Sequence, residues 1–423
     1  MRILWVKANK LLPVHSGGDI RSYHIARYLG SRHELCFFSY YGGKPDPEYE
    51  RGMAEHFPGA CCMGMGTQES VPARALDYLL RLPDQAPYAV SRFKSARVRE
   101  KLDSWFKQGR FDVAVCDFLD AAVNFPLSLT VPSVLFQHNV ESEIWRRHAE
   151  TEANPVRRPI YCLEFRKMLA YEKAVVQGFP HVVAVSEHDR KLMSAWVDAS
   201  RVTVVPTGVD LQQYQPDFSN REVGPLVLFV GAMDWEPNID AVEYFCKEVW
   251  PSVLTQIPEA KFRIVGRNAD RRVQRLGCSS IEVTGRVPAV IDHLRAAAVV
   301  IVPLRIGGGT RLKIYEAMAT GRAVVSTSVG AEGLDVHHGR DIILADNPKA
   351  FAEAVLMLLK DGDVRRRYER AAAELAAGYD WPVVGARFEE VFEKVTGHAA
   401  VPRDGQYAAV SVAGSGASSD PGV

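Results

Sequence analysis

The residues best suited to chemistry lie in one stretch, Pro303 to Gly321, where an apolar run meets three glycines and two cations. The run from Ala296 to Pro303 is wholly apolar, which is typical of a parallel strand buried on both faces. Gly307 to Gly309 follow, and a helix is predicted to begin near Thr310. Glycines let the backbone approach a ligand closely, and a helix N-terminus offers unpaired N–H groups and partial positive charge. The turn is therefore suited to an anion.

Two cations, Arg311 and Lys313, are predicted to lie in the first turn of that helix. Positive charge there opposes the helix dipole, so stability alone rarely explains it. We interpret the pair as a diphosphate site, in which a forked guanidinium and a compact ammonium converge on one anion. Glu316 lies beside Lys313 on the same helix and could accept hydrogen bonds from vicinal hydroxyls, such as those of a ribose. The alternative is a solvated loop and an amphipathic helix in which Lys313 and Glu316 form a surface ion pair.

This stretch, with Gly321 and the predicted strand Arg322 to Ser326, resembles the retaining glycosyltransferases of family 4, which have the GT-B fold. Their signature is two glutamates separated by seven residues. Glu316 matches the second, which binds the donor ribose, whereas the first falls at Gly308. The resemblance implies that the glycine turn and Thr310 contact the donor. The departure at Gly308 leaves open a protein of this fold that binds a sugar nucleotide, or scaffolds an assembly, without turnover.

The composition sets broad limits on the fold and on the partners. A chain of 423 residues is long enough for two domains. Lys plus Arg and Asp plus Glu both number 51, so the zero net charge does not point to nucleic acid. Seven scattered cysteines without CxxC spacing favour a reduced compartment and no zinc site. Met1 to Lys7 is expected to be a strand rather than a signal peptide, and no apolar window is long enough for a membrane span. We expect a cytoplasmic protein, with or without peripheral contact to the inner face of the membrane.

The order of apolar runs and helical patterns predicts an α/β protein of two Rossmann-like domains whose parallel sheets face a central cleft. The first domain is expected at residues 1–206 and the second at 226–380, with a linker at 207–225. A helix from Val383 to Thr396 is expected to return to the first domain, as the family resemblance implies. Residues 398–423 are rich in Gly, Ala, Ser and Pro and are expected to be disordered. In the first domain we expect strands at Ile3–Val6, Leu35–Tyr40, Val113–Cys116, Val134–Gln137, Val182–Val185 and Val202–Val205.

Two sites are predicted at the carboxyl ends of first-domain strands, where ligands gather in open α/β sheets. Gly17 and Gly18 follow the first strand, and the family resemblance implies that this loop faces the donor phosphate and the acceptor. The alternative is a tight turn with Asp19 as the helix N-cap. His138 follows the strand Val134–Gln137, and the resemblance places it close to the transferred sugar. The alternative for His138 is a hydrogen bond to a neighbouring backbone carbonyl.

The second domain carries the remaining donor contacts that the resemblance implies. Many relatives have an arginine just after the glycine at position 231 and a lysine a few residues later, both on the diphosphate. After Gly231 this chain instead has Ala232 and, roughly, Asn238. We therefore expect Arg311 and Lys313 to supply the missing charge. Arg286 lies in the segment that meets the nucleobase in relatives, although a surface arginine is equally consistent with the sequence.

The stretch from Arg92 to Arg110 is basic and carries aromatic and aliphatic residues at roughly helical spacing. Such a helix can lie on an anionic membrane surface, or it can be an ordinary helix with a solvated basic face. Because many relatives extend lipid-linked sugars, the resemblance makes both a membrane contact and a lipid-linked acceptor plausible.

The function expected from the sequence is retaining transfer of a sugar from a nucleoside-diphosphate sugar to a saccharide or lipid-linked acceptor, in bacterial surface polysaccharide synthesis. Arg311 and Lys313 would neutralise the leaving diphosphate and His138 would orient the sugar. These cations and the turn amides cover the leaving group, so neither a metal nor another cofactor is expected. The first strand lacks the Gly-x-Gly-x-x-Gly turn of a nicotinamide-dependent enzyme. The rival is the inactive binding or scaffold protein described above.

Overall fold

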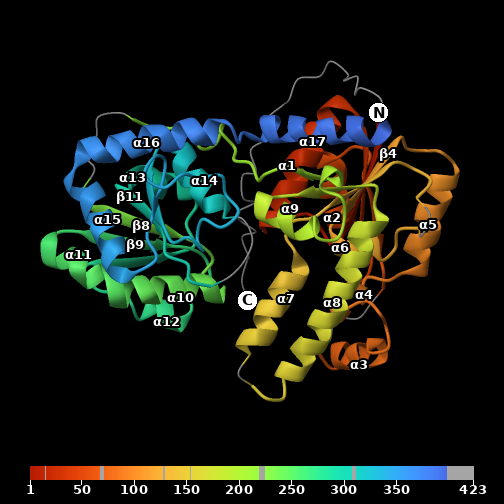
Figure 1. The fold of residues 1–423 in the computed structure, drawn as a ribbon, viewed down its shortest axis with the longest axis horizontal. Coiled ribbons are helices and arrows are strands. Elements are labelled where there is room, and N and C mark those ends of the chain that lie inside the picture. Colours follow the sequence, from red (N-terminus) through yellow and green to blue (C-terminus); the bar gives the residue numbers. More distant parts are fainter. Residues whose placement is uncertain are drawn as a thin grey trace, which may run out of the picture.

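The protein has two α/β domains, each built on its own parallel sheet (Figure 1). The computed structural model describes residues 1–14, 16–66, 71–126, 129–152, 154–218, 224–306 and 311–397, with only the backbone of 71–75. The predicted α/β class and the two Rossmann-like domains are confirmed. The predicted glycine turn at 307–310 and the predicted disordered tail at 398–423 lie outside the described residues.

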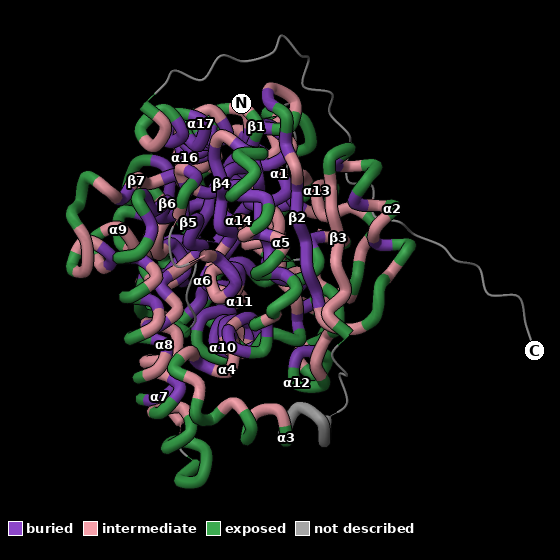
Figure 2. Tube along the Cα trace, turned by 90° about the vertical axis from the view of Figure 1, so that its right-hand side faces the viewer, coloured by how far each residue is buried: buried purple, intermediate pink, exposed green. Residues whose placement is uncertain are grey.

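The first domain holds a seven-stranded sheet in the order β3-β2-β1-β4-β5-β6-β7. Each of the six strands predicted in this domain is present, within two residues at either end. The central strands are buried on both faces, as their continuous apolar runs predict (Figure 2). The edge strand β3 was not predicted: it is short and half-buried, and it has no β-branched or aromatic residue. The strands are β1 (Arg2–Ala8), β2 (Glu34–Tyr41), β3 (Cys61–Gly64), β4 (Val113–Asp117), β5 (Ser133–Phe136), β6 (His181–Ala184) and β7 (Val202–Val204).

The second domain holds a six-stranded sheet in the order β10-β9-β8-β11-β12-β13. Its central strands are short runs of Val, Ile, Leu and Phe, and the cluster of buried side chains around them forms the core of this domain. The strands are β8 (Leu226–Val230), β9 (Lys261–Val265), β10 (Ile281–Gly285), β11 (Val299–Val302), β12 (Ala323–Ser326) and β13 (Ile343–Leu344).

Helices cover both sheets and connect their parallel strands. In the first domain these are α1 (Gly17–Arg32), α2 (Pro47–His56), α3 (Val71–Arg81), α4 (Tyr88–Ser91), α5 (Ala96–Lys107), α6 (Leu119–Ala122), α7 (Glu141–Thr151), α8 (Arg158–Gly178), α9 (Glu187–Met193) and the 3₁₀ turn η1 (Ala199–Arg201). In the second they are α10 (Glu236–Tyr244), the π-helical turn η2 (Phe245–Val249), α11 (Trp250–Gln256), α12 (Arg271–Gln274), α13 (Val290–Ala296), α14 (Leu312–Ala319), α15 (Pro348–Lys360), α16 (Gly362–Ala377) and α17 (Trp381–Thr396).

Two helix starts differ from the sequence prediction. Ser16, not Asp19, is the N-cap of α1: its hydroxyl accepts a hydrogen bond from the Asp19 N–H, so Gly17 and Gly18 lie inside the first helical turn. Helix α14 begins at Leu312, so Arg311 is its N-cap residue and only Lys313 lies in the first turn.

The last helix, α17, returns to the first domain and packs along α1, as predicted (Figure 1). Glu389 anchors it there, because its carboxylate lies 2.8 Å from Nε2 of His33 and 3.0 Å from Nε of Arg32. Where α17 begins, Val209 forms an isolated parallel bridge with Asp380. The chain therefore passes from one domain to the other twice, between β7 and β8 and again before α17.

The basic stretch from Arg92 to Arg110 contains one helix, α5, and the short helix α4 ends just before it. The apolar face of α5 is buried in the first-domain core through Val98, Leu102, Trp105 and Phe106. It is therefore not available to enter a bilayer, and any membrane attraction of this segment must come from its exposed cations. Among the described residues, no helix is both long and apolar enough to cross a bilayer.

The packing of α17 on α1 gives a stability prediction. A β-carbon at Gly385 would lie 2.4 Å from Cγ of Tyr28, far inside normal contact, whereas one at Gly178 in α8 would meet nothing. We expect Gly385→Ala to lower the free energy of unfolding by about 1–3 kcal/mol through overpacking. The control Gly178→Ala should leave it unchanged or raise it slightly. Denaturant unfolding checks this, and equal stability of the two variants would contradict the close packing of α17 on α1.

Candidate functional site

The first turn of α1 lies between two polar clusters, one in each domain. On one side, a β-carbon at Gly18 would lie 3.6 Å from Cδ2 of His138. On the other, a β-carbon at Gly17 would lie 3.7 Å from Cδ1 of Leu312, the first residue of α14. Leu312 itself packs against the first-domain core. The two predicted glycines therefore lie close to a residue of each cluster, with room for ordinary van der Waals contact on both sides.

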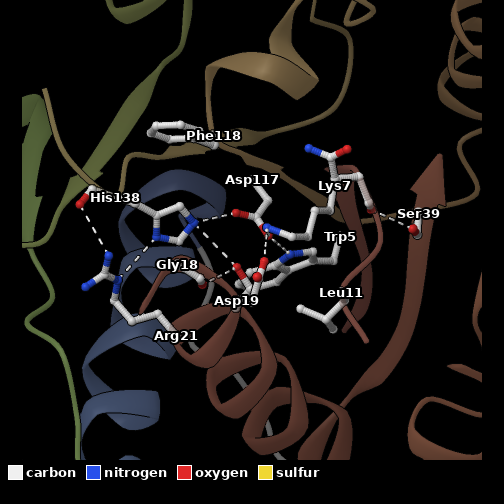
Figure 3. Close-up of polar contacts among 12 residues, drawn as sticks. Trp5, Lys7, Leu11, Gly18, Asp19, Arg21, Ser39, Asp117, Phe118 and His138 are labelled. Carbon is white, nitrogen blue, oxygen red and sulfur yellow. Dashed lines mark hydrogen bonds and ion pairs between the residues drawn. The ribbon is translucent and has the colours of Figure 1, made fainter. Parts of the chain in front are cut away.

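The first cluster, which we call the His138 cluster, consists of Lys7, Asp19, Arg21, Asp117 and His138 (Figure 3). Nε2 of His138 lies 2.7 Å from Oδ1 of Asp117, and Nε of Arg21 donates to Nδ1 of His138 over 3.3 Å. An arginine can only donate, so Nδ1 carries no proton and the proton is on Nε2, directed at Asp117. The predicted alternative, a hydrogen bond from the ring to a backbone carbonyl, is not the arrangement observed.

The charges of this cluster compensate one another. Burial lowers the pKa of His138 to about 4, and the cations Arg21 and Lys7 contribute to the fall, so the ring is neutral at neutral pH. Burial opposes ionisation of Asp117, but Lys7, His138 and the indole of Trp5 together hold its pKa below the usual value. Nζ of Lys7 lies 3.5 Å from Asp117 and 3.4 Å from Asp19. Most of the polar side chains of the His138 cluster are therefore paired with one another.

Beside the His138 cluster lies a cavity of about 1110 Å³. It opens at the carboxyl ends of β1, β2, β4 and β5, which is where ligands bind in open parallel sheets. Its lining is polar and carries both signs of charge, including Lys10, Lys44, Asp46 and Asp120. A cavity of this size and polarity can hold a hydrated, hydroxyl-rich molecule.

The second cluster, which we call the Lys313 cluster, surrounds the start of α14. Nζ of Lys313 donates to Oδ1 of Asn238 over 3.0 Å and lies 4.5 Å from the ring centre of Phe229. A β-carbon at Gly231 would lie 2.8 Å from that ammonium and 2.7 Å from the Asn238 amide. Only glycine therefore allows Lys313 to reach the loop after β8. The ammonium therefore lies beside the loop in which the sequence lacks the expected cations.

Arg311 completes the cationic side of this cluster. Its guanidinium lies over the ring of Trp235 at 5.0 Å, and the residue is only 7% exposed. Burial lowers the pKa of Arg311 to about 10, and it lowers that of Lys313 to about 7, with the charge of Arg311 adding to the second effect. Burial and mutual repulsion both disfavour the charged forms of two neighbouring cations, and a bound anion would oppose both effects.

Glu316 lies one turn below Lys313 and has a defined partner. The hydroxyl of Tyr214, from the crossing segment, donates to its carboxylate. Burial raises the pKa of Glu316, which Tyr214 and Lys313 oppose. The predicted surface ion pair between Lys313 and Glu316 is not formed, because the ammonium turns to Asn238 instead. The carboxylate is thus held near the cations without neutralising them.

The two clusters are joined across the domain boundary. Nη2 of Arg147 in α7 lies 3.2 Å from Oε1 of Glu332, in the loop after β12. Glu332 is also the carboxylate that most favours the charged form of Arg311. A small cavity of about 40 Å³, lined by both domains, lies beside this pair. The Arg147–Glu332 ion pair therefore ties α7 of the first domain to the loop beside the Lys313 cluster.

The predicted site residues have different outcomes. Gly17, Gly18 and His138 gather on the first-domain side, and Gly231, Arg311, Lys313 and Glu316 gather on the second. Arg286 is exposed after β10, and none of its contacts ties it to either cluster. Gly307, Gly308, Gly309 and Thr310 lie outside the described residues. No bound ligand tests any of these roles, so they stay predictions.

Sequence reasoning missed several residues of the site. Asp117 ends strand β4, and the rule that found His138 at a strand end could have found it. Lys7 was read only as evidence against a signal peptide. The stacking of Trp235 on Arg311 and the hydrogen bond from Lys313 to Asn238 join distant segments, and no local pattern signals such contacts.

Solved structures share this fold over almost the whole chain. Anabaena Alr3699/HepE, solved in complex with UDP-glucose, aligns with a TM-score of 0.64 at 14% identity and covers 93% of this chain and 100% of that one. The sucrose-phosphate synthase of Thermosynechococcus elongatus aligns with a TM-score of 0.67 at 16% identity, over 94% and 99% of the two chains. At such identities the likeness shows the fold alone, which is GT-B.

Curated relatives are more similar in sequence. The phosphatidyl-myo-inositol mannosyltransferase of Mycolicibacterium smegmatis is 29% identical over 227 residues, 51% of this chain and 57% of that protein. The protein of the same name from Mycobacterium tuberculosis H37Rv is 25% identical over 334 residues, 75% and 83% of the two chains. The D-inositol 3-phosphate glycosyltransferase of Paenarthrobacter aurescens is 28% identical over 260 residues, 55% and 62%. The matches to the first and third span less than two thirds of those proteins.

Two family models match the two domains in turn. The model described as "Glycosyltransferase Family 4" matches residues 16–213, which include the His138 cluster apart from Lys7. The model described as "Glycosyl transferases group 1" matches residues 224–361, which include the whole Lys313 cluster. With the fold and both clusters in place, the chain belongs to the family 4 glycosyltransferases.

Proposed function

We propose that the protein transfers a sugar, with retention at the anomeric carbon, from a nucleoside-diphosphate sugar to a hydroxyl-bearing acceptor. The observation that carries this proposal is the Lys313 cluster. It sets two desolvated cations beside a glycine loop, opposite a large polar cavity in the other domain. The donor diphosphate would lie on the second domain and the acceptor in the cavity of the first.

The chemistry needs charge neutralisation as the bond between the sugar and the diphosphate breaks. Arg311 and Lys313 would supply it, together with the N-terminus of α14. Glu316 would take the ribose hydroxyls and Arg286 would cover the base. His138, held neutral by its neighbours, would present its ring beside Gly18 and line the place of the transferred sugar. No divalent metal is proposed, because cationic side chains already cover the leaving group.

The relatives guide the choice of substrates to test. HepE was solved with UDP-glucose, so uridine sugars are the first donors to screen, followed by guanosine sugars. Two relatives are named for acceptors that contain inositol, one of them a lipid. These relatives support a saccharide or lipid-linked acceptor and a role in the synthesis of a surface polysaccharide or glycolipid.

The second candidate function is a protein that binds a sugar nucleotide without turnover. The glycine at position 308, where many relatives have a glutamate near the sugar, is the observation that favours it. Binding without release of nucleoside diphosphate would support this candidate over transfer.

We expect the purified protein to bind a nucleoside-diphosphate sugar and to release nucleoside diphosphate by transfer or slow hydrolysis. Arg311→Ala should weaken donor binding by about 1.5–3 kcal/mol, the range for a charge-assisted hydrogen bond. The control Arg263→Ala, which removes a surface partner of Glu282, should leave binding unchanged. Calorimetry with a folded Arg311→Ala variant of unchanged affinity would refute the diphosphate assignment.

Turnover should also survive excess chelator, and a loss restored by magnesium or manganese would refute the metal-free scheme.

The lowered pKa of Lys313 predicts a pH dependence of donor binding. Above pH 7 the free protein increasingly loses the ammonium proton, and binding the diphosphate must restore it. Donor affinity should therefore fall as pH rises from 7 to 9, by up to about tenfold per unit. A nucleotide sugar is the right probe because its diphosphate does not titrate in this range. Lys313→Arg should flatten the profile, and an equal slope in both proteins would count against Lys313.

We further propose that the first domain touches an anionic membrane. Six cations of the basic stretch, Arg92, Lys94, Arg97, Arg99, Lys107 and Arg110, are exposed. Helix α3 adds exposed leucines, with Leu79 60% and Leu80 71% exposed. Each Lys or Arg near an anionic surface contributes about 1 kcal/mol, so several together would hold the protein there reversibly.

Co-sedimentation with anionic vesicles should show binding that fades as salt rises, and neutral vesicles should bind little. Reversing two charges by Lys94→Glu and Arg97→Glu should weaken binding, since these residues lie on the proposed face. Reversing Arg367 and Arg370, exposed on α16 of the second domain, should not. Equal binding to both vesicle types, or none, would leave α5 as an ordinary helix with a solvated face.

A further inference from the structure

The turn that follows β4 has a backbone conformation that side chains rarely adopt. Phe118 has φ 77° and ψ 170°, a region populated almost only by glycine. Two hydrogen bonds hold it there, from its N–H to the carbonyls of Phe136 (2.9 Å) and Cys116 (3.1 Å). A phenylalanine kept in such a conformation indicates that its ring, or the residues that the turn positions, serve a purpose that glycine could not.

The turn brings three side chains, those of Asp117, Phe118 and Asp120, to the large cavity of the first domain. Asp117 points to His138 on one side of the turn. The ring of Phe118 lies 5.4 Å from the ring of His138 and lines the cavity (Figure 3). Asp120, in the short helix α6, lines the same cavity. The turn therefore brings an aromatic face and a carboxylate into the lining of the same cavity.

The carboxylate of Asp120 is not used by the protein. Among the described residues it has no hydrogen-bond or ion-pair partner, although it is only partly exposed. Burial raises its pKa to about 6, which Arg92 and Lys7 oppose from a distance. Nearby in the lining, Oδ1 of Asn139 is buried and also accepts no hydrogen bond from the described residues. Two oxygen acceptors in one cavity thus lack donors.

These two acceptors specify the chemistry of a ligand in this part of the cavity. The buried Oδ1 of Asn139 costs free energy unless a ligand supplies a donor, and the partly exposed carboxylate of Asp120 can exchange water for a ligand donor. A phosphate, which offers only acceptors when ionised, would be repelled, whereas hydroxyl groups are donors that a carboxylate can take in pairs. An aromatic face beside them suits the C–H face of a saturated ring, which packs against it with little loss of water contacts.

We propose, building on the proposed function, that Phe118, Asp120 and Asn139 form the acceptor subsite, and that this subsite recognises a cyclic polyol, a sugar or cyclitol ring. The ring packs on Phe118, and neighbouring hydroxyls donate to Asp120 and Asn139. Any phosphate attached to that ring would lie outside this part of the cavity, toward the cations Lys10 and Lys44 of the same lining.

The test measures release of nucleoside diphosphate from a donor by the full-length protein, with added methyl glycopyranosides of glucose, galactose and mannose, or with myo-inositol. At least one ring compound should accelerate release, and acyclic glycerol should not. Asp120→Asn and Phe118→Ala should raise the KM for that ring compound by about tenfold or more, with donor affinity unchanged. Asp103→Asn, a carboxylate of the same domain away from the cavity, is the matched control and should behave as the wild type.

A purely structural role for the turn predicts a different pattern. Phe118→Gly relieves the backbone conformation that Phe118→Ala keeps, so the glycine variant should melt at a higher temperature than the alanine variant. Both should nevertheless show the same raised KM. An unchanged KM in Asp120→Asn and Phe118→Ala, or recovery of KM in Phe118→Gly, would overturn the proposal. So would donor hydrolysis that no ring compound accelerates. A protein that binds no donor at all would instead remove the proposed function, and this inference with it.

Discussion

The site depends on one electrostatic constraint, which is that two cations are held out of water beside each other in the second domain. Lys313 reaches the loop after β8 only because position 231 is glycine, and its ammonium meets an amide oxygen and an aromatic ring there. No carboxylate among the described residues pairs with it. Removing a charge from water costs several kcal/mol unless an opposite charge replaces the water. The arrangement is therefore incomplete until an anion arrives, which is the physical reason for reading it as a diphosphate site.

In the first domain, by contrast, the buried charges are already paired within the protein. Its buried Lys7 lies between two aspartates, and His138 is neutral with both ring nitrogens engaged. That cluster is complete without a ligand and is suited to fix geometry rather than to bind charge. The parts of this domain left incomplete are the oxygens of Asp120 and Asn139, farther along the same cavity. This difference between the domains suits a charged donor on the second domain and a neutral, hydroxyl-rich acceptor on the first.

Much of the fold could be predicted from the sequence because parallel strands buried on both faces read as plain apolar runs. The runs at Val113–Cys116 and Leu226–Val230 are strands β4 and β8 within a residue. Edge strand β3 was missed because it has only four residues, none of them β-branched or aromatic. Helix starts were harder to predict: Asp19 was considered as a cap, whereas the hydrogen bond from its own N–H makes Ser16 the cap. The basic helix was ambiguous because charge and spacing do not reveal which core accepts the apolar face.

The site was predictable only where a local pattern carried it. Glycines beside cations pointed to Arg311 and Lys313, and a strand end pointed to His138. Asn238, Trp235 and Arg21 act through contacts to segments more than 70 positions away, as in the bond from Lys313 to Asn238, for which the separation is 75. Such partners follow from the tertiary fold. The unusual backbone of Phe118 is likewise invisible in the sequence, because nothing local distinguishes it from an ordinary phenylalanine after a strand.

The most direct test of the central claim is a binding cycle that pairs removal of one phosphate with removal of one charge. Calorimetry would compare a nucleoside diphosphate with the matching monophosphate, in the wild type and in Lys313→Met. If the Lys313 cluster holds the diphosphate, the wild type should prefer the diphosphate by about 1.5–3 kcal/mol, and most of that preference should vanish in the variant. The same preference in both proteins would show that the terminal phosphate binds elsewhere, and would contradict the account.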